Sequence, residues 1–280
     1  MKRTKVSYYQ RRRREWQNFS IEQIFNDLRA NLSGSEFDTE INTSKYVSSG
    51  LLKRAYNTIE AIFRQGDINH VTGDIHYVSI LLKKKKTINT IHDIGFLARS
   101  KGFKHWLFKK LWIEWPARRS KLITVVSNST KQELLKYTTI PENKIRVIPV
   151  AISGKFVQGV NKTEGTSLQI LQIGSAKNKN LGRLIEAVSG LDVSLEIIGK
   201  PQQELLDLME RNKVKYHCSN NLSIDDVVAK YHEADILFFA STYEGFGMPI
   251  IEAQTVGLPV ITSNTSSMPE VAGDAAIFVD

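Results

Sequence analysis

The most unusual chemistry in this sequence is carried by nine residues near its end, Glu-Gly-Phe-Gly-Met-Pro-Ile-Ile-Glu at 244–252. They follow an apolar run at 236–239, which predicts a strand, a loop and a helix that begins near Pro249. Glycines let a ligand approach the backbone, and the free N–H groups of a helix N-terminus attract an anion. A carboxylate accepts both hydrogen bonds of a vicinal diol. The string predicts a sugar-nucleotide site; the alternative is an ordinary loop with solvated carboxylates.

A second loop follows the apolar run at 168–173 and reads Gly-Ser-Ala-Lys-Asn-Lys-Asn at 174–180. A glycine just after a strand, with lysines just before a helix, is typical of phosphate-binding loops, although the Walker pattern Gly-x-x-x-x-Gly-Lys-Ser/Thr is absent. The ammonium group of Lys179 can neutralise a diphosphate there. The alternative is a solvated lysine, which is disfavoured because the positive end of a helix repels it.

Polar residues also follow two strands predicted in the first half of the chain. A His-Asp pair at 92–93 ends one of them, and His92 can donate a hydrogen bond to a sugar hydroxyl or to a backbone carbonyl. A structural histidine that caps a loop explains the pair equally well. Thr-Gly-Asp at 72–74 and the nearby His76 either line an acceptor site or act as turn and helix-cap residues, the commoner role for these types.

Composition excludes several other classes of site. The six histidines are scattered and no carboxylate cluster has metal-ligand spacing, so we expect no metal ion and no other cofactor. Serine-nucleophile and Gly-x-Gly-x-x-Gly signatures are absent. The single cysteine, Cys218, cannot form an intrachain disulfide. No signal-peptide pattern is present and no apolar run approaches the ~20 residues of a membrane span, which predicts a cytoplasmic protein.

Short apolar runs alternate with helical patterns along all 280 residues. The predicted strands are 5–9, 37–42, 67–71, 87–91, 122–126 and 145–150, then 168–173, 194–198, 214–217, 236–239, 260–262 and 277–279. The predicted helices are 21–32, 50–64, 76–83, 103–118 and 129–137, then 181–188, 201–211, 224–232, 248–256 and 267–271. This alternation predicts the α/β class, with parallel sheets covered by helices on both faces.

A glycine-containing stretch at 153–166 divides the pattern into two Rossmann-like doubly wound domains, residues 1–155 and residues 156–280. Two such sheets joined by one linker are expected to face a cleft, with ligands at the carboxyl ends of the strands. The charge is uneven, because residues 1–150 hold 28 Lys and Arg against 13 Asp and Glu, whereas residues 151–280 hold 10 against 16. The basic half is therefore expected to meet something anionic.

One stretch of the basic half, at 103–115, is rich in tryptophan as well as lysine. With the basic runs at 11–14 and 83–86 it can dock on an anionic membrane surface. The alternative is a helix that packs on the sheet, since most helices of such folds need their apolar face for the core. That face would hold Phe103, Trp106, Leu107 and Leu111. No nucleic-acid-binding motif accompanies the charge, so nucleic acid is not an expected partner.

Taken together, these segments resemble glycosyltransferase family 4, whose members have the two-domain GT-B fold. The resemblance is clear from about residue 65 to residue 280 and is specific to the family, not to one substrate. Besides the two loops above, it rests on Thr-Ile-His-Asp at 90–93, Val-Val-Ser-Asn-Ser-Thr-Lys at 125–131, the strand at 144–149, Leu-Pro-Val-Ile-Thr at 258–262 and Pro-Glu at 269–270.

The resemblance implies roles for individual residues. Glu244 and His92 are the implied catalytic residues, Glu244 on the hydroxyls of the donor sugar and His92 reaching that sugar from the N-terminal domain. Glu252 would hold the ribose diol, and Lys179 the diphosphate. The implied donor-binding set is Gly174, Ser175, Lys179, Asn180, Gly245, Phe246, Gly247, Met248 and Glu252.

The resemblance also implies a reaction. A sugar would pass from a nucleotide-diphosphate-sugar to a glycan or lipid-linked acceptor, with retention of the anomeric configuration and without a metal ion. The product would be a surface polysaccharide or glycolipid, and the enzyme would lie in the cytoplasm or at the inner face of the membrane. Two alternatives stay open: a sugar-nucleotide epimerase, and a catalytically impaired fragment that binds polyanions or a membrane surface.

The chain departs from the family pattern in three places. Ser175 stands where the family often has arginine, so phosphate stabilisation would fall on Lys179 with help from Lys177. The N-terminal glycine-rich loop of the family is replaced by Gln10 and four arginines. The family continues past the position of Asp280 with helices that cross back to the first domain, so we expect the C-terminal domain to be truncated.

Overall fold

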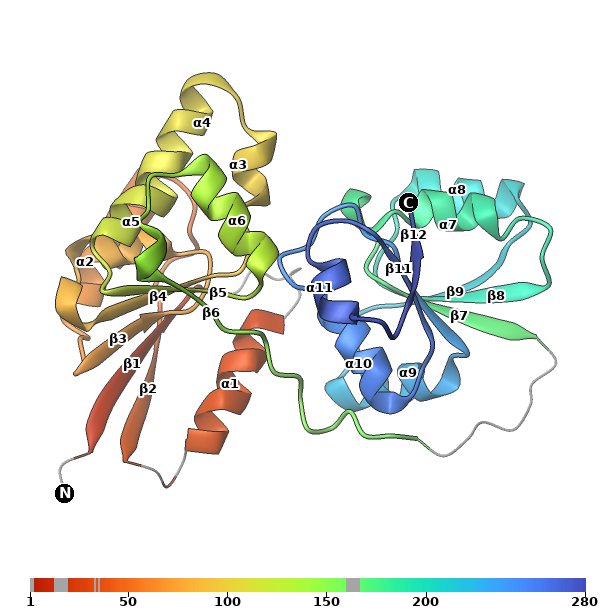
Figure 1. The fold of residues 1–280 in the computed structure, drawn as a ribbon, viewed down its shortest axis with the longest axis horizontal. Helices are drawn as coiled ribbons and strands as arrows, with labels where there is room; N and C mark the ends of the chain where they lie inside the picture. Colours follow the sequence, from red (N-terminus) through yellow and green to blue (C-terminus); the bar gives the residue numbers. More distant parts are fainter. Residues whose placement is uncertain (1–2, 13–19, 33, 35, 160–166) are drawn as a thin grey trace. The chain divides into compact units, whose positions relative to one another are not determined.

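The computed structural model describes residues 3–12, 20–32, 34, 36–159 and 167–280. The chain forms two compact units, unit 1 from Met1 to Ala151 and unit 2 from Ile152 to Asp280 (Figure 1). Each unit is built on a six-stranded sheet in which every paired strand is parallel. The predicted α/β class with two doubly wound sheets is confirmed. The boundary predicted after residue 155 lies four residues beyond Ala151.

The sheet of unit 1 has the order β2-β1-β3-β4-β5-β6. Its strands are β1 (Thr4–Gln10), β2 (Phe37–Thr43), β3 (Ile68–Val71), β4 (Thr87–Ile91), β5 (Leu122–Val125) and β6 (Ile145–Val147). The helices are α1 (Ser20–Leu32), α2 (Leu51–Ile62), α3 (Gly95–Arg99), α4 (Gly102–Phe108), α5 (Trp115–Arg118) and α6 (Asn128–Tyr137), with 3-10 turns η1 (His76–Leu81), η2 (Lys84–Lys86) and η4 (Glu142–Lys144) and a π-helix η3 (Lys109–Glu114).

The sheet of unit 2 has the order β12-β11-β10-β7-β8-β9. Its strands are β7 (Leu168–Ile173), β8 (Val193–Ile198), β9 (Lys215–Ser219), β10 (Ile236–Phe239), β11 (Val260–Ser263) and β12 (Ile277–Val279). The helices are α7 (Leu181–Ala187), α8 (Gln203–Arg211), α9 (Ile224–Glu233), α10 (Met248–Val256) and α11 (Met268–Ala272), with the 3-10 turn η5 (Lys177–Lys179).

Two separate apolar clusters show that the sheet of unit 2 is covered on both faces. One cluster joins Leu184 of α7 and Met209 of α8 to the strands. The other joins Tyr231 of α9 and Ile250 of α10 to β10. In Figure 1, α7 and α8 accordingly lie on the opposite side of the strands from α9 and α10. This is the arrangement that right-handed crossovers produce when successive connections run in opposite directions along a sheet.

The strand order reverses direction at one position in each sheet. In unit 2 the strands at this position are β7 and β10, and in unit 1 they are β1 and β3. Connections lead away from such a pair in opposite directions, which leaves the carboxyl ends of both strands uncovered. Ligands of open α/β sheets bind there. The two switch points are therefore the first places to search for a site.

The helix predicted over 103–118 is not continuous. It consists of α4, the π-helix η3 and α5, with Pro116 at the start of α5. Proline cannot donate the usual backbone hydrogen bond, and a π-helix rotates the side chains that follow it away from the face an α-helix would give them. The alternative in which Phe103 and Trp106 pack on the sheet is wrong, because both lie in α4, before this change of face, and are 76% and 51% exposed. Phe108, Trp112 and Ile113 pack on the core instead.

The remaining differences are local. All twelve predicted strands are present in the described part of the chain, and their ends differ from the predicted ones by at most three residues. The predicted helix at 76–83 is the 3-10 turn η1, and the five-residue α3 was not predicted because it is too short to show a helical period. β6 ends before Pro149, which has no N–H for a ladder. Within the described ranges, no helix is long and apolar enough to cross a membrane.

Candidate functional site

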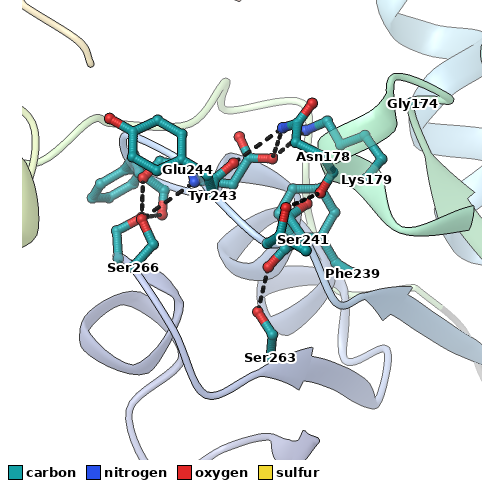
Figure 2. Close-up of polar contacts among 12 residues, drawn as sticks. Gly174, Asn178, Lys179, Phe239, Ser241, Tyr243, Glu244, Ser263 and Ser266 are labelled. Atoms are coloured by element: carbon teal, nitrogen blue, oxygen red, sulfur yellow. Dashed lines mark hydrogen bonds and ion pairs between the residues drawn. The ribbon is translucent and has the colours of Figure 1, made fainter. Parts of the chain in front are cut away.

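Two loops meet at the switch point of unit 2, and they are the two loops that the sequence singled out (Figure 2). The loop after β7 carries Lys179, and the loop after β10 carries Glu244. The Lys179 Nζ atom lies 2.6 Å from Glu244 Oε1 and 4.5 Å from the centre of the Phe239 ring. Both charged side chains are largely shielded from solvent, so water screens their attraction only in part. The fold thus joins two opposite charges that lie 65 positions apart in the chain.

The Lys179 side chain has its place because residue 174 is a glycine. Gly174 has a φ of +86°, and a Cβ atom there would come within 3.0 Å of Lys179 Cε. The amide Nε2 of Gln172, a buried residue of β7, donates to the carbonyl oxygens of Gly174 at 3.2 Å and of Lys179 at 3.1 Å. Both ends of the loop are therefore fixed to the strand below them.

Two other predicted donor-binding residues belong to the same loop. Asn180 has the left-handed conformation, with φ 60° and ψ 24°, and it precedes the first residue of α7. Ser175 packs against Gly199, where a Cβ atom would come within 3.1 Å of Ser175 Oγ. Because Gly199 directly follows β8, the neighbouring strand supports the loop from behind.

The Glu244 loop is fixed by short polar side chains (Figure 2). Asn178 Nδ2 donates to the Tyr243 carbonyl at 3.0 Å and to Glu244 Oε1 at 3.3 Å. Ser266 Oγ donates to the Glu244 carbonyl at 2.7 Å and accepts from its N–H at 3.3 Å, and Ser267 Oγ lies 3.1 Å from the same carbonyl oxygen. The backbone of Glu244 is thus held on both sides of its side chain.

Helix α10 begins at Met248, as the sequence predicted. Gly247 precedes it with a φ of +107°, and Ser267 Oγ donates to the Phe246 carbonyl at 2.7 Å. The first N–H groups of a helix have no partner within it. They lie directly after the glycine loop that carries Glu244, so Gly245, Phe246, Gly247 and Met248 form one turn that leads into a positive helix end.

Glu252 lies one turn into α10 and is not the solvated helix residue of the alternative interpretation. Tyr231 Oη on α9 donates to Glu252 Oε2 at 2.6 Å. Burial raises the pKa of the Glu252 carboxyl, and the hydrogen bond from Tyr231 lowers it in part. Burial also raises the pKa of Tyr231 well above its ordinary value, so the phenol keeps its proton and stays a donor. One carboxylate oxygen is therefore committed to Tyr231.

His92 lies in unit 1, after β4. Its Nε2 atom lies 2.9 Å from the Thr72 carbonyl, which can only accept, so Nε2 carries the proton. Burial lowers the pKa of His92, and the backbone hydrogen bond raises it in part. The ring is thus neutral near pH 7, and its Nδ1 atom is a hydrogen-bond acceptor. Of the two donor roles predicted for His92, the structure shows the one to a backbone carbonyl.

The two predicted loops of unit 2 meet at the Lys179–Glu244 pair and Glu252 lies one turn further along α10, whereas His92 belongs to the other unit. Sequence reasoning did not assign roles to Gln172, Asn178, Tyr231, Ser266 or Ser267. Asn178 lies inside a loop that the sequence marked, so its position was a usable signal. The two serines and Tyr231 carry no local signal, because only the fold brings them to Glu244 and Glu252. Across the described ranges, no group of three His, Cys, Asp or Glu could hold a metal ion.

Solved structures with this two-sheet architecture include glycosyltransferases of the GT-B class. A glycosyltransferase from Rickettsia africae ESF-5 matches with a TM-score of 0.77 at 20% identity, covering 100% of this chain and 85% of that one. At that identity the likeness shows the fold alone.

The sequence matches two family descriptions that abut at the unit boundary. Residues 38–153 match Glycosyltransferase Family 4, and residues 155–280 match Glycosyl transferases group 1. The chain belongs to the family 4 glycosyltransferases of GT-B fold.

Two relatives are similar over most of this chain. It is 29% identical over 215 residues to the serotype-specific mannosyltransferase WbdA of Escherichia coli, a match that covers 67% of this chain and 26% of that protein. It is 28% identical over 213 residues to the O-antigen chain mannosyltransferase RfbU of Salmonella typhimurium, covering 72% and 58%. The chain therefore spans less than two thirds of the length of either relative.

Proposed function

We propose that this protein is a retaining, metal-independent glycosyltransferase. It takes a sugar from a nucleotide-diphosphate-sugar and adds it to a glycan or lipid-linked acceptor, in the synthesis of a surface polysaccharide. The observation that carries the proposal is the 2.6 Å ion pair between Lys179 and Glu244, directly before the N-terminus of α10. Family membership supports the reaction class, and the names of the two relatives support a hexose donor and an O-antigen type of product.

The ion pair matches the two ends of such a donor. A diphosphate carries more negative charge than one carboxylate, so it competes with Glu244 for Lys179. The released Glu244 carboxylate then accepts hydrogen bonds from hydroxyls of the sugar. When the bond between sugar and diphosphate breaks, Lys179 and the N–H groups at the start of α10 stabilise the charge on the leaving group. These positive groups belong to the protein itself, which is the basis for proposing a reaction without a metal ion.

Glu252 and His92 complete the proposed machinery. The carboxylate of Glu252 has one oxygen on Tyr231, which leaves the other to accept hydrogen bonds from the ribose diol. The neutral ring of His92 has Nε2 on the Thr72 carbonyl, which leaves Nδ1 to accept a hydrogen bond from a sugar hydroxyl. Retention of configuration is part of the proposal because the family transfers sugars in that way.

Calorimetric titration with nucleotide-sugars tests the donor site, with GDP-mannose and the UDP-hexoses as ligands. We expect binding by at least one of them, unchanged by EDTA, and at least a tenfold loss in Glu252→Ala, since hydrogen bonds to a charged group are worth about 1.5–3 kcal/mol. Glu210→Ala on α8 is the control, because Glu210 is an exposed residue of the same unit. If no nucleotide-sugar binds and Glu252→Ala behaves like the unchanged protein, the proposal is wrong.

Product analysis tests the reaction itself. With the donor that binds best and a bacterial lipid or glycan extract as acceptor, NMR of the anomeric proton should show the donor's configuration preserved in the product. Inversion would contradict the retaining mechanism. Donor hydrolysis or transfer that requires added Mg²⁺ would contradict metal independence.

We also propose that unit 1 contacts an anionic membrane surface through α4. Phe103 and Trp106 are exposed, and their rings stack at 5.6 Å. Lys101, at the start of the helix, is exposed as well. Aromatic side chains beside lysines suit the interface of an anionic bilayer, where the rings enter the headgroup layer and the ammonium groups meet phosphates. Of the basic run at 11–14, residues 13 and 14 lie outside the described ranges.

Sedimentation with vesicles tests this contact. We expect binding to vesicles with anionic lipid that persists at about 0.5 M salt, because ring insertion does not depend on screening. Phe103→Ser with Trp106→Ser should abolish pelleting without changing nucleotide binding. No pelleting of the unchanged protein would contradict the proposal. Pelleting together with a complete lack of donor binding would favour the catalytically impaired membrane-binding module instead.

A further inference from the structure

Unit 1 has a pocket at its own switch point, where β1 and β3 are neighbours. The pocket encloses about 280 Å³. Its lining includes three arginines, two carboxylates and a tryptophan, namely Arg11, Arg12, Arg54, Asp74, Asp93 and Trp112. Arg11 and Arg12 directly follow β1, in the place where the sequence lacks the family's glycine-rich loop. The pocket therefore has charges of both signs and an aromatic wall within one unit.

The arginines differ in how their charge is balanced. Arg11 is paired with two carboxylates, Glu22 at 3.1 Å and Asp74 at 2.7 Å, so its charge is neutralised within the protein. Arg12 donates to the Lys45 carbonyl at 2.9 Å, and within the described ranges no carboxylate lies within 4.0 Å of its guanidinium. A backbone carbonyl orients an arginine but does not cancel its charge.

Arg54 of α2 is the second of the pocket's three arginines that has no acid partner among the described residues. Its guanidinium lies 4.4 Å from the centre of the Trp112 ring, and its NH2 atom donates to the Ser48 carbonyl at 3.2 Å. The ring and the carbonyl hold the planar group in one orientation. An arginine fixed in this way presents its remaining N–H groups as a fork, which matches the oxygens of a phosphate.

The pocket lining also offers an acceptor and a flat apolar surface. Asp93 is exposed after β4, and its Oδ1 accepts from the Gly95 N–H at 3.0 Å, which leaves the other oxygen to a ligand. Phe108 packs edge-on against Trp112, with ring centres 5.5 Å apart. A carboxylate beside aromatic rings suits a sugar, which has hydroxyl donors around its edge and C–H groups on its faces.

We propose that this pocket binds a sugar that carries a phosphate, and that it is the place where the acceptor of the proposed transferase docks by its glycosyl phosphate. The phosphate lies between Arg12 and Arg54, and the sugar lies against Trp112 with a hydroxyl on Asp93. Two unbalanced arginines match the two negative charges of a phosphate monoester or of a diphosphate better than the single charge of a carboxylate. The inference deepens the proposed function. The binding of a sugar phosphate does not depend on that function, but its role as the acceptor does.

The test uses simple probes in a Lys179→Ala background, so that the switch point of unit 2 contributes no phosphate site. Saturation-transfer NMR and tryptophan fluorescence measure binding of mannose 1-phosphate, methyl mannoside and inorganic pyrophosphate. Mannose 1-phosphate and pyrophosphate should bind, and Arg54→Gln should weaken both by about 10- to 100-fold, since each lost charge-assisted pair has about that value. Asp93→Asn should weaken mannose 1-phosphate and leave pyrophosphate unchanged.

Two further variants test whether any loss of binding is specific to the arginines of the pocket. Arg12→Gln repeats the test on a residue that does not pack on Trp112, and Arg118→Gln on α5 is the matched exposed control. If Arg12→Gln and Arg54→Gln both bind mannose 1-phosphate as tightly as Arg118→Gln does, the proposal is overturned. A soluble sugar phosphate and a lipid-linked one are distinguished by comparing mannose 1-phosphate with a polyprenyl diphosphate mannose in detergent micelles. The ligand that the pocket recognises is the one whose affinity falls more in Arg54→Gln.

The outcome is separable from that of the proposed function. Nucleotide-sugar titration of Arg54→Gln in the otherwise unchanged protein should give the unaltered affinity, because Arg54 contacts Ser48 and Trp112 and none of the residues assigned to the donor. A pocket that binds glycosyl phosphates in a protein that binds no nucleotide-sugar would contradict the transferase and keep the phosphate site. Unaltered nucleotide-sugar binding with no phosphate binding in unit 1 would overturn the inference alone.

Discussion

The switch points of the two units are alike in architecture and different in chemistry. In unit 2 the site is built from glycine loops whose opposite charges, Lys179 and Glu244, neutralise each other at 2.6 Å. In unit 1 the corresponding position has no glycine loop, and Arg12 and Arg54 keep an unbalanced charge in the described part of the chain. The comparison teaches that parallel-sheet topology decides where a ligand can bind, and that the loop residues decide which ligand it is.

The largest effect should come from removing the charge that faces the diphosphate. Lys179→Ala should lower nucleotide-sugar affinity by at least 100-fold, because the diphosphate loses its nearest cation and Glu244 becomes an unpaired, partly buried carboxylate. Lys177→Ala is the control within the same turn, and its nucleotide-sugar affinity should fall by no more than a few-fold. Equal losses in the two variants, measured by titration calorimetry, would show a diffuse electrostatic effect and not the specific contact.

The next prediction separates two effects of replacing a glycine: a steric clash with a neighbouring side chain and a strained backbone conformation. Gly174→Ala has both a strained φ of +86° and a Cβ atom within 3.0 Å of Lys179 Cε, whereas Gly190→Ala has a φ of +80° and no heavy atom within 4 Å. Both should lose about 1 kcal/mol of stability. Only Gly174→Ala should also lose donor affinity, by about tenfold, because Lys179 is displaced. Thermal melts and titrations of both variants measure the two losses.

A smaller effect concerns the proton on Glu252. Tyr231→Phe removes the hydrogen bond that lowers the pKa of this buried carboxyl, so its pKa should rise further. The pH below which nucleotide affinity falls should then move upward, with only a few-fold loss well above it. Titrations between pH 5 and pH 8 measure the profile, and Tyr216→Phe on β9 is the control. A profile identical to that of the unchanged protein would contradict the role given to Tyr231.

The last prediction concerns the stability of unit 1 in acid and leaves donor affinity aside. Burial lowers the pKa of His70 in unit 1 from 6.5 to about 4. Because the unfolded chain binds the proton more tightly, stability should be complete above pH 6.5 and should fall as the pH drops from 6.5 toward 4. At pH 5 the loss should be about 1–2 kcal/mol. His70→Asn should flatten this part of the profile in thermal melts, and an unchanged slope would contradict the assignment.

Predictability differed between the two units for a physical reason. In unit 2 the strand β7 and the helix α10 have the predicted bounds, because Gly174 follows the strand and Gly247 and Gly257 flank the helix. In unit 1 the stretch at 103–118 was misjudged, since a π-helix and Pro116 rotate its faces in a way that no fixed period describes. Phe103 and Trp106, which lie before the π-helix, are exposed, whereas Trp112 and Ile113 within it pack on the core.

The sequence by itself determined the α/β class, the two doubly wound sheets and the two loops of the donor site. Each of these depends on short-range patterns, namely strand and helix periods, glycines that permit a positive φ, and residue types beside a helix start. Only the tertiary structure decided that Lys179 pairs with Glu244, that Tyr231 holds Glu252, and that Arg12 and Arg54 share one pocket. Those contacts join residues 21 to 65 positions apart, and their distances depend on strand order and helix packing, which no local pattern encodes.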